Sequence, residues 1–245
     1  MPNPYFRFKQ FTVYHDRCAM KVTTDSCFFG AWAAQEIKNS NTDSYREKIK
    51  TVLDIGAGTG LLSLMIAQKN EVEIQAVEID SEASEQAREN IQASPWKNRI
   101  HILNKDIHTF QPNKKYDSII CNPPFYENEL ASEVPKKNVA HHSKELTISE
   151  VLQFIKIHLS EDGIFFLMYP FKRKEEVDGM LRENELHVND LVVLSQSVKH
   201  SPFRVIIKGS NKTTTRQESL LSVCDENQQY TNAFVNLLKD YYLYL

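Results

Sequence analysis

The chain has 245 residues, of which 41% are hydrophobic and 25% are charged, and its formal net charge is −3. This composition excludes global disorder, and the length allows one sizeable hydrophobic core. A slightly acidic balance also excludes a protein that binds polyanions through overall charge alone.

Four cysteines are present, at Cys18, Cys27, Cys121 and Cys224, and they form no C-x-x-C pair. A zinc site or redox motif is therefore not predicted. No apolar run approaches the roughly 18–20 residues that cross a bilayer, and the N-terminal sequence lacks the apolar core of a signal peptide. We expect a cytoplasmic protein that binds no membrane and no metal, with a monomer as the default.

The first 48 residues read as an aromatic strand or hairpin, then a helix, then a polar link, at 5–14, 26–38 and 39–48. From residue 50 onwards, strand and helix patterns alternate. We expect strands at 51–55, 73–79, 100–104, 116–121, 163–170, 192–198 and 203–209, with 218–224 as a candidate for one more. We expect helices at 61–69, 81–91, 146–159, 172–184 and 230–241. This alternation predicts an α/β fold with a doubly wound, mostly parallel sheet, and a late hairpin makes one strand antiparallel.

A glycine-rich turn, L-D-I-G-A-G-T-G at 53–60, follows the first of these strands and opens a helix. Gly56, Gly58 and Gly60 are spaced more closely than in the dinucleotide fingerprint G-x-G-x-x-G, and Asp54 precedes them. D-x-G-x-G-x-G is the pattern of Rossmann-like methyltransferases that use S-adenosylmethionine. An acid beside the turn suits a ligand with ammonium and sulfonium groups and no phosphate. A nicotinamide enzyme is the chief alternative.

Acidic residues mark the ends of the next two strands: Glu78 lies at the end of the second, and Asp106, whose neighbour is Ile107, lies just after the third. Ligands of doubly wound sheets bind outside the carboxyl ends of the strands. Glu78 is placed to accept hydrogen bonds from two ribose hydroxyls, and Asp106 from the amine of adenine. Asp106 alone could equally be a helix cap, so the prediction depends on these acids occurring in register with the glycine turn.

The fourth strand ends in N-P-P-F, at Asn122, Pro123, Pro124 and Phe125. In an arbitrary protein a rigid turn would be the favoured interpretation. At this edge of the sheet, the Asn122 side-chain oxygen and the Pro123 carbonyl could instead accept from the amino group of a planar base. Phe125 could stack on that base. Prolines would fix these acceptors before the reaction, which is electrostatic preorganisation.

N-P-P-[YF] after the fourth strand resembles the motif of amino-group methyltransferases. The opening stretch F-K-Q-F-T-V-Y-H-D-R-C-A-M-K-V-T-T-D-S-C-F-F-G-A-W-A, at 8–33, is similar to that of the bacterial tRNA1(Val) (adenine(37)-N6)-methyltransferases. Within it, M-K-V-T-T-D resembles the family segment that folds over the cofactor, which implies cofactor-binding roles for Lys21, Thr24 and Asp25. The resemblance covers nearly the whole chain, including the closing Y-T-N-A-F and D-Y-Y-L.

This resemblance implies a class I, Rossmann-like methyltransferase with a seven-stranded sheet in a single domain, 1–245. Residues 1–48 would be an extension that covers the cofactor site, and 49–245 would be the core. S-adenosylmethionine would be the cofactor, and the anticodon loop of a valine tRNA the partner, with methylation of adenosine 37 at N6. The resemblance implies that the glycine turn and the two strand-end acids bind the cofactor. It also implies that the base is held by Asn122, Pro123, Pro124 and Phe125.

Three alternatives stay open at this point. A protein glutamine N5-methyltransferase also needs N-P-P-aromatic, and N-P-P-F occurs in guanine-N2 RNA methyltransferases. A non-catalytic RNA-binding module is the third. For contact with tRNA phosphates, we consider the basic stretch 199–216, which holds five basic and no acidic residues, together with groups at 172–174, 136–137 and 141–142. A solvated strand face is the other interpretation of these charges.

Overall fold

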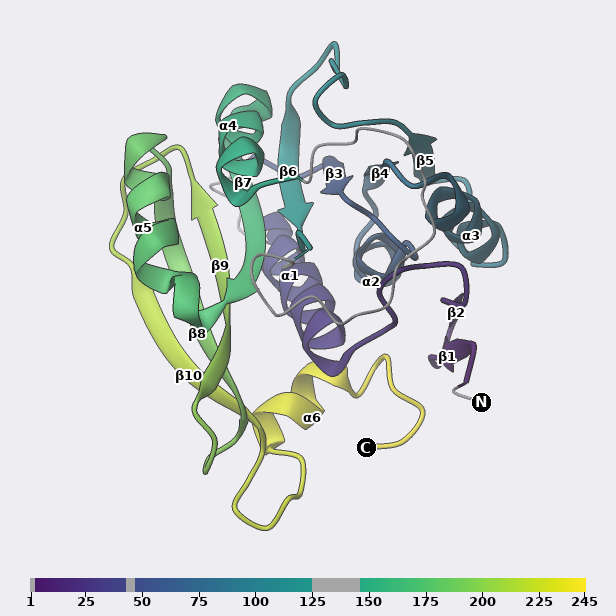
Figure 1. Ribbon diagram of the computed structural model, residues 1–245, viewed down its shortest axis with the longest axis vertical. Helices are drawn as coiled ribbons and strands as arrows, with labels where there is room; N and C mark the ends of the chain where they lie inside the picture. The colour runs from purple at the N-terminus through teal and green to yellow at the C-terminus, as the bar shows by residue number, and fades with distance from the viewer. Residues whose placement is uncertain (1–2, 43–46, 125–145) are drawn as a thin grey trace, which may run out of the picture.

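The computed structural model describes residues 3–42, 47–124 and 146–245. Within these ranges, an eight-stranded sheet has the order β10-β8-β9-β7-β6-β3-β4-β5 (Figure 1). The strands are β3 (Thr51–Ile55), β4 (Glu73–Glu78), β5 (Ile100–Asn104), β6 (Tyr116–Cys121), β7 (Leu159–Pro170), β8 (His187–Ser197), β9 (Pro202–Ser210) and β10 (Gln217–Cys224).

The strand directions confirm the predicted doubly wound sheet. Neighbouring strands are parallel except at β9, which is antiparallel to both β7 and β8. The expected number of seven strands is wrong by one, because β10 pairs in parallel with β8 and extends the edge of the sheet. β7 and β8 also begin earlier than expected, since Leu159 of β7 pairs with Tyr116 of β6, and His187 of β8 pairs with Ser210 of β9.

Helices cover both faces of the sheet (Figure 1). They are α1 (Thr24–Thr42), α2 (Leu61–Lys69), α3 (Ser81–Gln92), α4 (Ile148–His158), α5 (Lys174–Glu183) and α6 (Asn232–Leu238), with a short 3₁₀ helix, η1 (Phe171–Arg173). A buried hydrophobic cluster lies on each face of the sheet. One contains side chains of α1, α2 and α6, and the other contains those of α4 and α5. In β6, Ile120 belongs to the first cluster while Ile119 and Cys121 belong to the second, as strand alternation requires.

The chain order places a switch point at the centre of the sheet. From β3 the chain runs outward through β4 to β5, and it then returns to β6 on the other side of β3. The loops that follow β3 and β6 therefore diverge in opposite directions and leave a crevice between their carboxyl ends. The glycine turn begins at Gly56 on one side of this crevice, and Asn122 begins the loop on the other.

The N-terminal region begins with the predicted hairpin, β1 (Tyr5–Arg7) paired with β2 (Thr12–Tyr14). Phe8 bridges to Tyr242 near the C-terminus, so the two ends of the chain lie side by side. α1 follows and buries Phe28, Phe29 and Ile37 in the core. The predicted link at 39–48 is wrong in its first part, because α1 continues to Thr42.

Hydrogen bonds of Asn39 and Asn41 explain this extension of α1. Gln35 Nε2 donates to Asn39 Oδ1 at 2.9 Å within the helix. The Asn41 amide both accepts from Ile49 N at 2.7 Å and donates to Ile49 O at 3.1 Å. Thr42 Oγ1 donates to Asn39 O at 2.8 Å and so satisfies a carbonyl of the last turn. The sequence pattern of a polar link does not reveal these contacts.

α3 begins at the predicted position and is capped by Asp80. The Asp80 side chain accepts from Ala83 N, and Ser81 is the first residue of the helix. Both residue types favour the N-cap, so the sequence alone favours neither.

Among the described residues, no helix is long and apolar enough to span a membrane, and no group of three or more His, Cys, Asp or Glu could hold a metal.

Candidate active site

A cavity of about 340 Å³ opens at the carboxyl ends of β3, β4, β5 and β6. Its walls come from the glycine turn, the ends of β4 and β5, the start of the loop after β6, and an N-terminal segment. Seven of the residues predicted from the sequence line it: Gly56, Gly58, Glu78, Asp106, Ile107, Asn122 and Pro124. Half of the fourteen predicted residues therefore meet at one place, as expected for residues near the carboxyl ends of the strands.

The glycine turn presents bare backbone to the cavity. Gly56 and Gly58 have φ of 69° and 53°, a left-handed conformation that other residues adopt only with strain. A Cβ placed on either would meet no described atom within 4 Å, so a side chain there would fill cavity space. Gly60 differs, because it does not line the cavity and a Cβ placed on it would contact Ala87 and Ile91 of α3.

Glu78 is fixed beside this turn by two backbone amides. Its Oε2 accepts from Gly58 N at 2.8 Å, and its Oε1 accepts from Asp80 N at 2.9 Å. Burial raises the pKa of the Glu78 carboxyl, and these hydrogen bonds counter the increase. The carboxylate is thus held rigidly at the cavity wall with acceptor capacity to spare, since each oxygen can accept more than one hydrogen bond.

Asp54 does not line the cavity. It is completely buried beneath the turn, where its Oδ2 accepts from Ser63 Oγ at 2.7 Å. Its Oδ1 has no hydrogen-bond partner within the described parts of the chain. Burial raises the pKa of Asp54 to about 6, against the effect of the Ser63 hydrogen bonds. The predicted direct role for this acid is therefore not supported by its position.

Asp106 lies at the cavity wall, and its carboxylate is hydrogen-bonded to His108 in the same loop. Its Oδ1 accepts from His108 N at 2.9 Å and lies 2.7 Å from His108 Nδ1. His108 Nε2 lies 3.2 Å from Glu150 Oε1, so both ring nitrogens face carboxylates. These carboxylates raise the pKa of His108 despite a desolvation effect in the opposite direction. Ile107 adds an apolar surface to the same wall.

Asn122 is half-buried, lines the same cavity as Glu78, and has an unusual hydrogen-bond pattern. Its Nδ2 donates to Ser26 Oγ at 3.3 Å, which ties the loop after β6 to the first turn of α1. Its Oδ1 is buried and finds no partner among the residues that the structure describes. A buried acceptor without a donor is costly, so such atoms mark strain or a missing ligand. Pro124 lines the cavity, Pro123 is buried beside it, and Phe125 lies outside the described residues.

The N-terminal segment reaches the cavity through residues other than those expected. Lys21 and Thr24 are exposed and do not line the cavity, and Asp25 accepts from Arg204 Nε at 2.8 Å. Cys18, Ala19 and Met20 line the wall instead. Met20 falls in the stretch M-K-V-T-T-D that was expected to cover the site, but the contact comes from the start of that stretch.

Sequence reasoning also missed several lining residues next to those it found. Ile79 and Asp80 directly follow Glu78, and Lys105 and His108 flank Asp106 and Ile107. Including the two residues on each side of Glu78 and of Asp106 in the prediction would have identified them. Leu146 lines the cavity from far along the chain, and no local signal indicates it.

The basic stretch 199–216 is largely paired within the protein. Arg204 pairs with Asp25, and Lys208 Nζ lies 2.6 Å from Glu36 and 2.7 Å from Asp190. Lys212 pairs with Asp162, and Arg216 with Asp178 and Glu218. These acids come from distant parts of the sequence, so the local charge count gave too strong an impression of a free basic surface. The groups at 136–137 and 141–142 lie outside the described residues.

Solved structures with similar folds are methyltransferases. A predicted O-methyltransferase from Agrobacterium tumefaciens aligns with a TM-score of 0.63 at 14% identity, covering 87% of this chain and 95% of that one. A ribosomal protein L11 methylase from Lactobacillus delbrueckii aligns with a TM-score of 0.55 at 16% identity, covering 82% and 84%. The model of the protein family described as "Methyltransferase small domain" also matches residues 39–160. The fold is that of a class I, Rossmann-like methyltransferase.

Relatives of higher identity narrow this class. The tRNA1(Val) (adenine(37)-N6)-methyltransferase of Parabacteroides distasonis is 36% identical over 246 residues, which cover 99% of both chains. The enzyme of the same name from Bacteroides thetaiotaomicron is 35% identical over the full length of both chains. The chain belongs to the tRNA1(Val) (adenine(37)-N6)-methyltransferase family, which confirms the resemblance noted from its opening stretch and N-P-P-F.

Proposed function

We propose that this protein transfers a methyl group from S-adenosylmethionine to N6 of adenosine 37, beside the anticodon of a valine tRNA. The observation that carries the proposal is the buried, unpartnered Oδ1 of Asn122, within the described residues, at the same cavity as the doubly anchored Glu78. The names of the full-length relatives support the same reaction, base and tRNA.

The lining of the cavity supports the proposed cofactor through its open backbone and its hydrogen-bond acceptors. The bare backbone at Gly56 and Gly58 allows close approach of a ligand. We infer that Glu78 binds the ribose hydroxyls, and that Asp106 and Ile107 bind the adenine. S-adenosylmethionine, when bound, supplies a methyl group on a positively charged sulfur. A structure of a glycopeptide N-methyltransferase with this cofactor, similar in fold at a TM-score of 0.53, supports its use.

Other predicted cofactor residues act indirectly in this proposal, because they do not line the cavity. Asp54 shapes the turn from below through Ser63 and places negative charge under a cationic ligand. Gly60 allows the turn to pack on α3. The wall formed by Cys18, Ala19 and Met20 takes the covering role that the sequence assigned to Lys21, Thr24 and Asp25.

The chemistry assigned to the loop after β6 is preorganisation of the attacking amine. The lone pair of an adenine amino group is delocalised into the ring, so the amine is a weak nucleophile until acceptors hold it. We assign Asn122 Oδ1 and the Pro123 carbonyl to accept its two N–H groups, and Phe125 to stack on the base. The buried Pro123 fixes the loop in advance. Holding the amine in line with the methyl supplies much of the acceleration, without a strong general base.

We further propose that residues 1–245 act as one methyltransferase domain. The 1–48 region shares the hydrophobic cluster of the 49–245 core through Phe8, Phe28 and Ile37. It also contributes Cys18, Ala19 and Met20 to the cavity. A shared core and a shared cavity favour one unit over a separate appendage.

The test is transfer of labelled methyl from S-adenosylmethionine to unmodified valine tRNA, followed by nucleoside analysis by mass spectrometry. We expect N6-methyladenosine. Labelled N2-methylguanosine would instead support the guanine alternative, which the Phe of N-P-P-F left open. Absence of label in RNA would contradict the proposal and direct attention to protein glutamine substrates or to a non-catalytic binder.

A further inference from the structure

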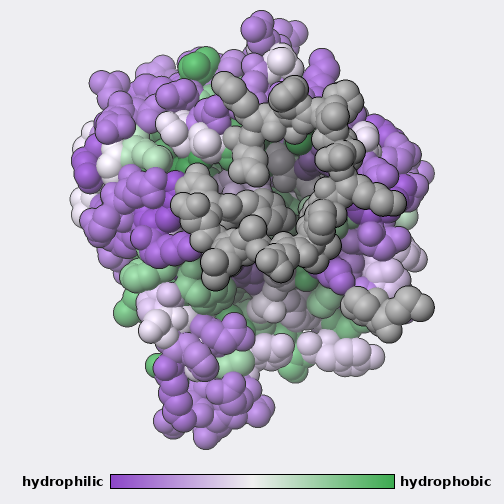
Figure 2. All heavy atoms as spheres, viewed as in Figure 1, coloured by the Kyte–Doolittle hydropathy of each residue, from purple (hydrophilic) through white to green (hydrophobic). Residues whose placement is uncertain are grey.

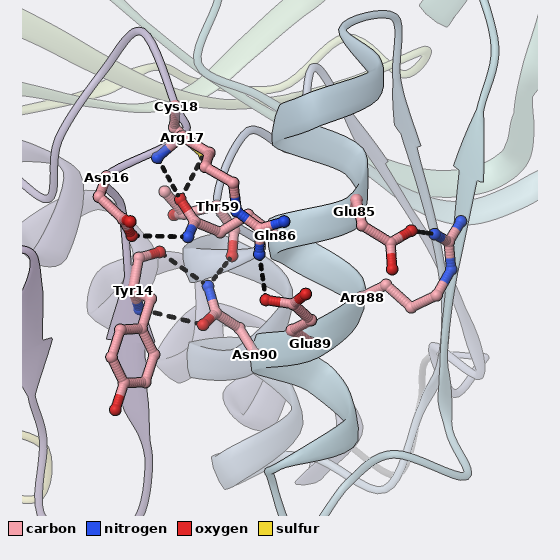
Figure 3. A network of polar contacts seen from close by, with 10 residues as sticks. All are labelled: Tyr14, Asp16, Arg17, Cys18, Thr59, Glu85, Gln86, Arg88, Glu89 and Asn90. Atoms are coloured by element: carbon pink, nitrogen blue, oxygen red, sulfur yellow. Dashed lines mark hydrogen bonds and ion pairs between the residues drawn. The ribbon is translucent and has the colours of Figure 1, made fainter.

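An N-terminal strap, residues 14–20, leads from β2 to the cavity and forms part of its wall. Its last three residues, Cys18, Ala19 and Met20, line the cavity. The strap contains no helix or strand beyond Tyr14, so its position must be fixed by other contacts. Figure 3 shows that these contacts come from one side of α3.

Gln86 holds the middle of the strap. This α3 side chain is 2% exposed. Its Oε1 accepts from Arg17 N at 2.9 Å, and its Nε2 donates to Asp16 Oδ1 at 2.8 Å (Figure 3). Cys18 Sγ lies 3.5 Å from the same Oε1. One buried amide therefore positions the two residues before the cavity wall and touches the first residue of that wall.

Asn90 lies one helical turn further along α3, on the same face, and is also 2% exposed. Its Oδ1 accepts from Tyr14 N at 3.0 Å, and its Nδ2 donates to Tyr14 O at 2.9 Å. The same Nδ2 donates to Thr59 O at 3.0 Å (Figure 3). Asn90 thus joins the start of the strap to the glycine turn, and these are two separate walls of one cavity.

Arg17 and Glu89 form an ion pair beside these amides (Figure 3). Their side chains are 36% and 57% exposed. Exposed pairs contribute about 1 kcal/mol or less because water and salt screen them. The buried amides, whose loss would leave unpaired polar groups, are expected to dominate.

We propose that Gln86 and Asn90 are positioning residues that hold the strap as a wall of the cavity and thereby set the affinity for the cofactor. Neither side chain lines the cavity. They act through the strap and, for Asn90, through the glycine turn. The inference rests on the proposed function, because it assumes that the cofactor occupies this cavity.

The test is calorimetric titration of the full-length protein with S-adenosylhomocysteine, the demethylated product of the proposed cofactor. Gln86→Ala should bind about tenfold more weakly than the wild type, as expected when a buried amide is lost. The matched control is Gln92→Ala, an exposed position at the end of the same helix, which should bind as the wild type does. Unchanged affinity in Gln86→Ala would overturn the inference while leaving the proposed function intact. No binding by the wild type would overturn both.

A complementary exchange separates positioning from a general loss of stability. Gln86→Glu places a carboxylate against that of Asp16, so affinity should fall. Adding Asp16→Asn restores a donor opposite the new acceptor, and affinity should return towards that of the wild type. Asp16 is exposed, so its replacement is compatible with folding. A double variant that binds no better than Gln86→Glu would contradict the proposal.

Kinetics give a second readout that a merely structural role would not produce. In Gln86→Ala, the KM for S-adenosylmethionine should rise while kcat at saturating cofactor and the KM for tRNA stay near their wild-type values. A fall in kcat with an unchanged KM for the cofactor would contradict a role in positioning the cofactor wall.

Discussion

Asn122 donates from Nδ2 to Ser26 Oγ at 3.3 Å, and this bond ties the loop after β6 to α1. Ser26 Oγ lies in turn 2.8 Å from Thr23 Oγ1, so the contact is supported by the first turn of α1. In this arrangement Oδ1 is the end of the amide that has no partner among the described residues. An α1 residue therefore holds a side chain that the sequence motif N-P-P-F supplies.

This orientation predicts the behaviour of Asn122→Ala. The variant should bind S-adenosylhomocysteine as the wild type does, because the cofactor wall is untouched. Its kcat for tRNA methylation should fall on the order of 100-fold, the usual cost of losing one preorganised polar contact to the reacting group. Asn98→Ala, at an exposed position, is the control. Normal turnover by Asn122→Ala would show that Asn122 does not hold the base.

Replacement of Glu78 should affect cofactor binding instead. A carboxylate accepts from Gly58 N and Asp80 N through different oxygens, and a Gln side chain has only one acceptor oxygen. Glu78→Gln should therefore weaken S-adenosylhomocysteine binding by at least about tenfold. Glu71→Gln changes a side chain that is 91% exposed and should leave binding unchanged. Equal affinities in calorimetry would exclude Glu78 as a ligand of the ribose.

Asp54 predicts a pH dependence of stability. Its pKa is raised to about 6 from the ordinary value of 3.8, so the folded chain holds this proton more tightly than the unfolded chain. The resulting stabilisation is complete below the unfolded pKa and is lost as pH rises through the folded pKa. Between about pH 4 and pH 7, Asp54→Asn should gain on the order of 2–3 kcal/mol relative to the wild type, because it has no proton to lose.

Urea unfolding at a series of pH values measures this difference for Asp54→Asn. The amide adds a constant offset, so the change with pH is the informative quantity. Asp162→Asn, with a side chain 48% exposed, should change by less than about 1 kcal/mol over the same range. Parallel stability curves for Asp54→Asn and the wild type would contradict a raised pKa at Asp54.

Lys208 predicts a loss of stability where the sequence suggested tRNA contact. Its side chain is 14% exposed and lies between Glu36 and Asp190. Lys208→Glu would bring three carboxylates together and should lower the free energy of unfolding by at least about 3 kcal/mol. Lys199→Glu, an exposed position in the same basic stretch, should cost less than about 1 kcal/mol. Retained stability with weaker tRNA binding in Lys208→Glu would restore the phosphate interpretation.

Local rules were sufficient for much of the fold and part of the site. β3, β5 and β6 match their predicted bounds because short apolar runs are bounded by polar turns. Gly56, Glu78 and Asn122 were found because each lies at the end of a strand of a doubly wound sheet or directly after it, and such positions meet at one edge. For these elements and residues, the neighbouring residues in the sequence are enough to predict the position in the fold.

The remaining features depend on contacts between distant segments. Gln86 and Asn90 occur in S-E-A-S-E-Q-A-R-E-N-I, where they read as part of a polar, solvated helix face. Only the path of the N-terminal strap buries them. The same path explains why Lys21 and Thr24 fall outside the cavity although the stretch that contains them was expected to cover it. The acids that pair with Lys208 are equally distant in sequence.

Methyl transfer to two valine tRNA transcripts that differ only at position 37 tests the central claim most directly. One transcript carries adenosine at this position and the other carries guanosine, and both are incubated with labelled S-adenosylmethionine. We expect N6-methyladenosine from the adenosine transcript and no label in the guanosine transcript. Equal labelling of both, or label in neither, would contradict the assignment of adenosine 37 as the substrate of this cavity.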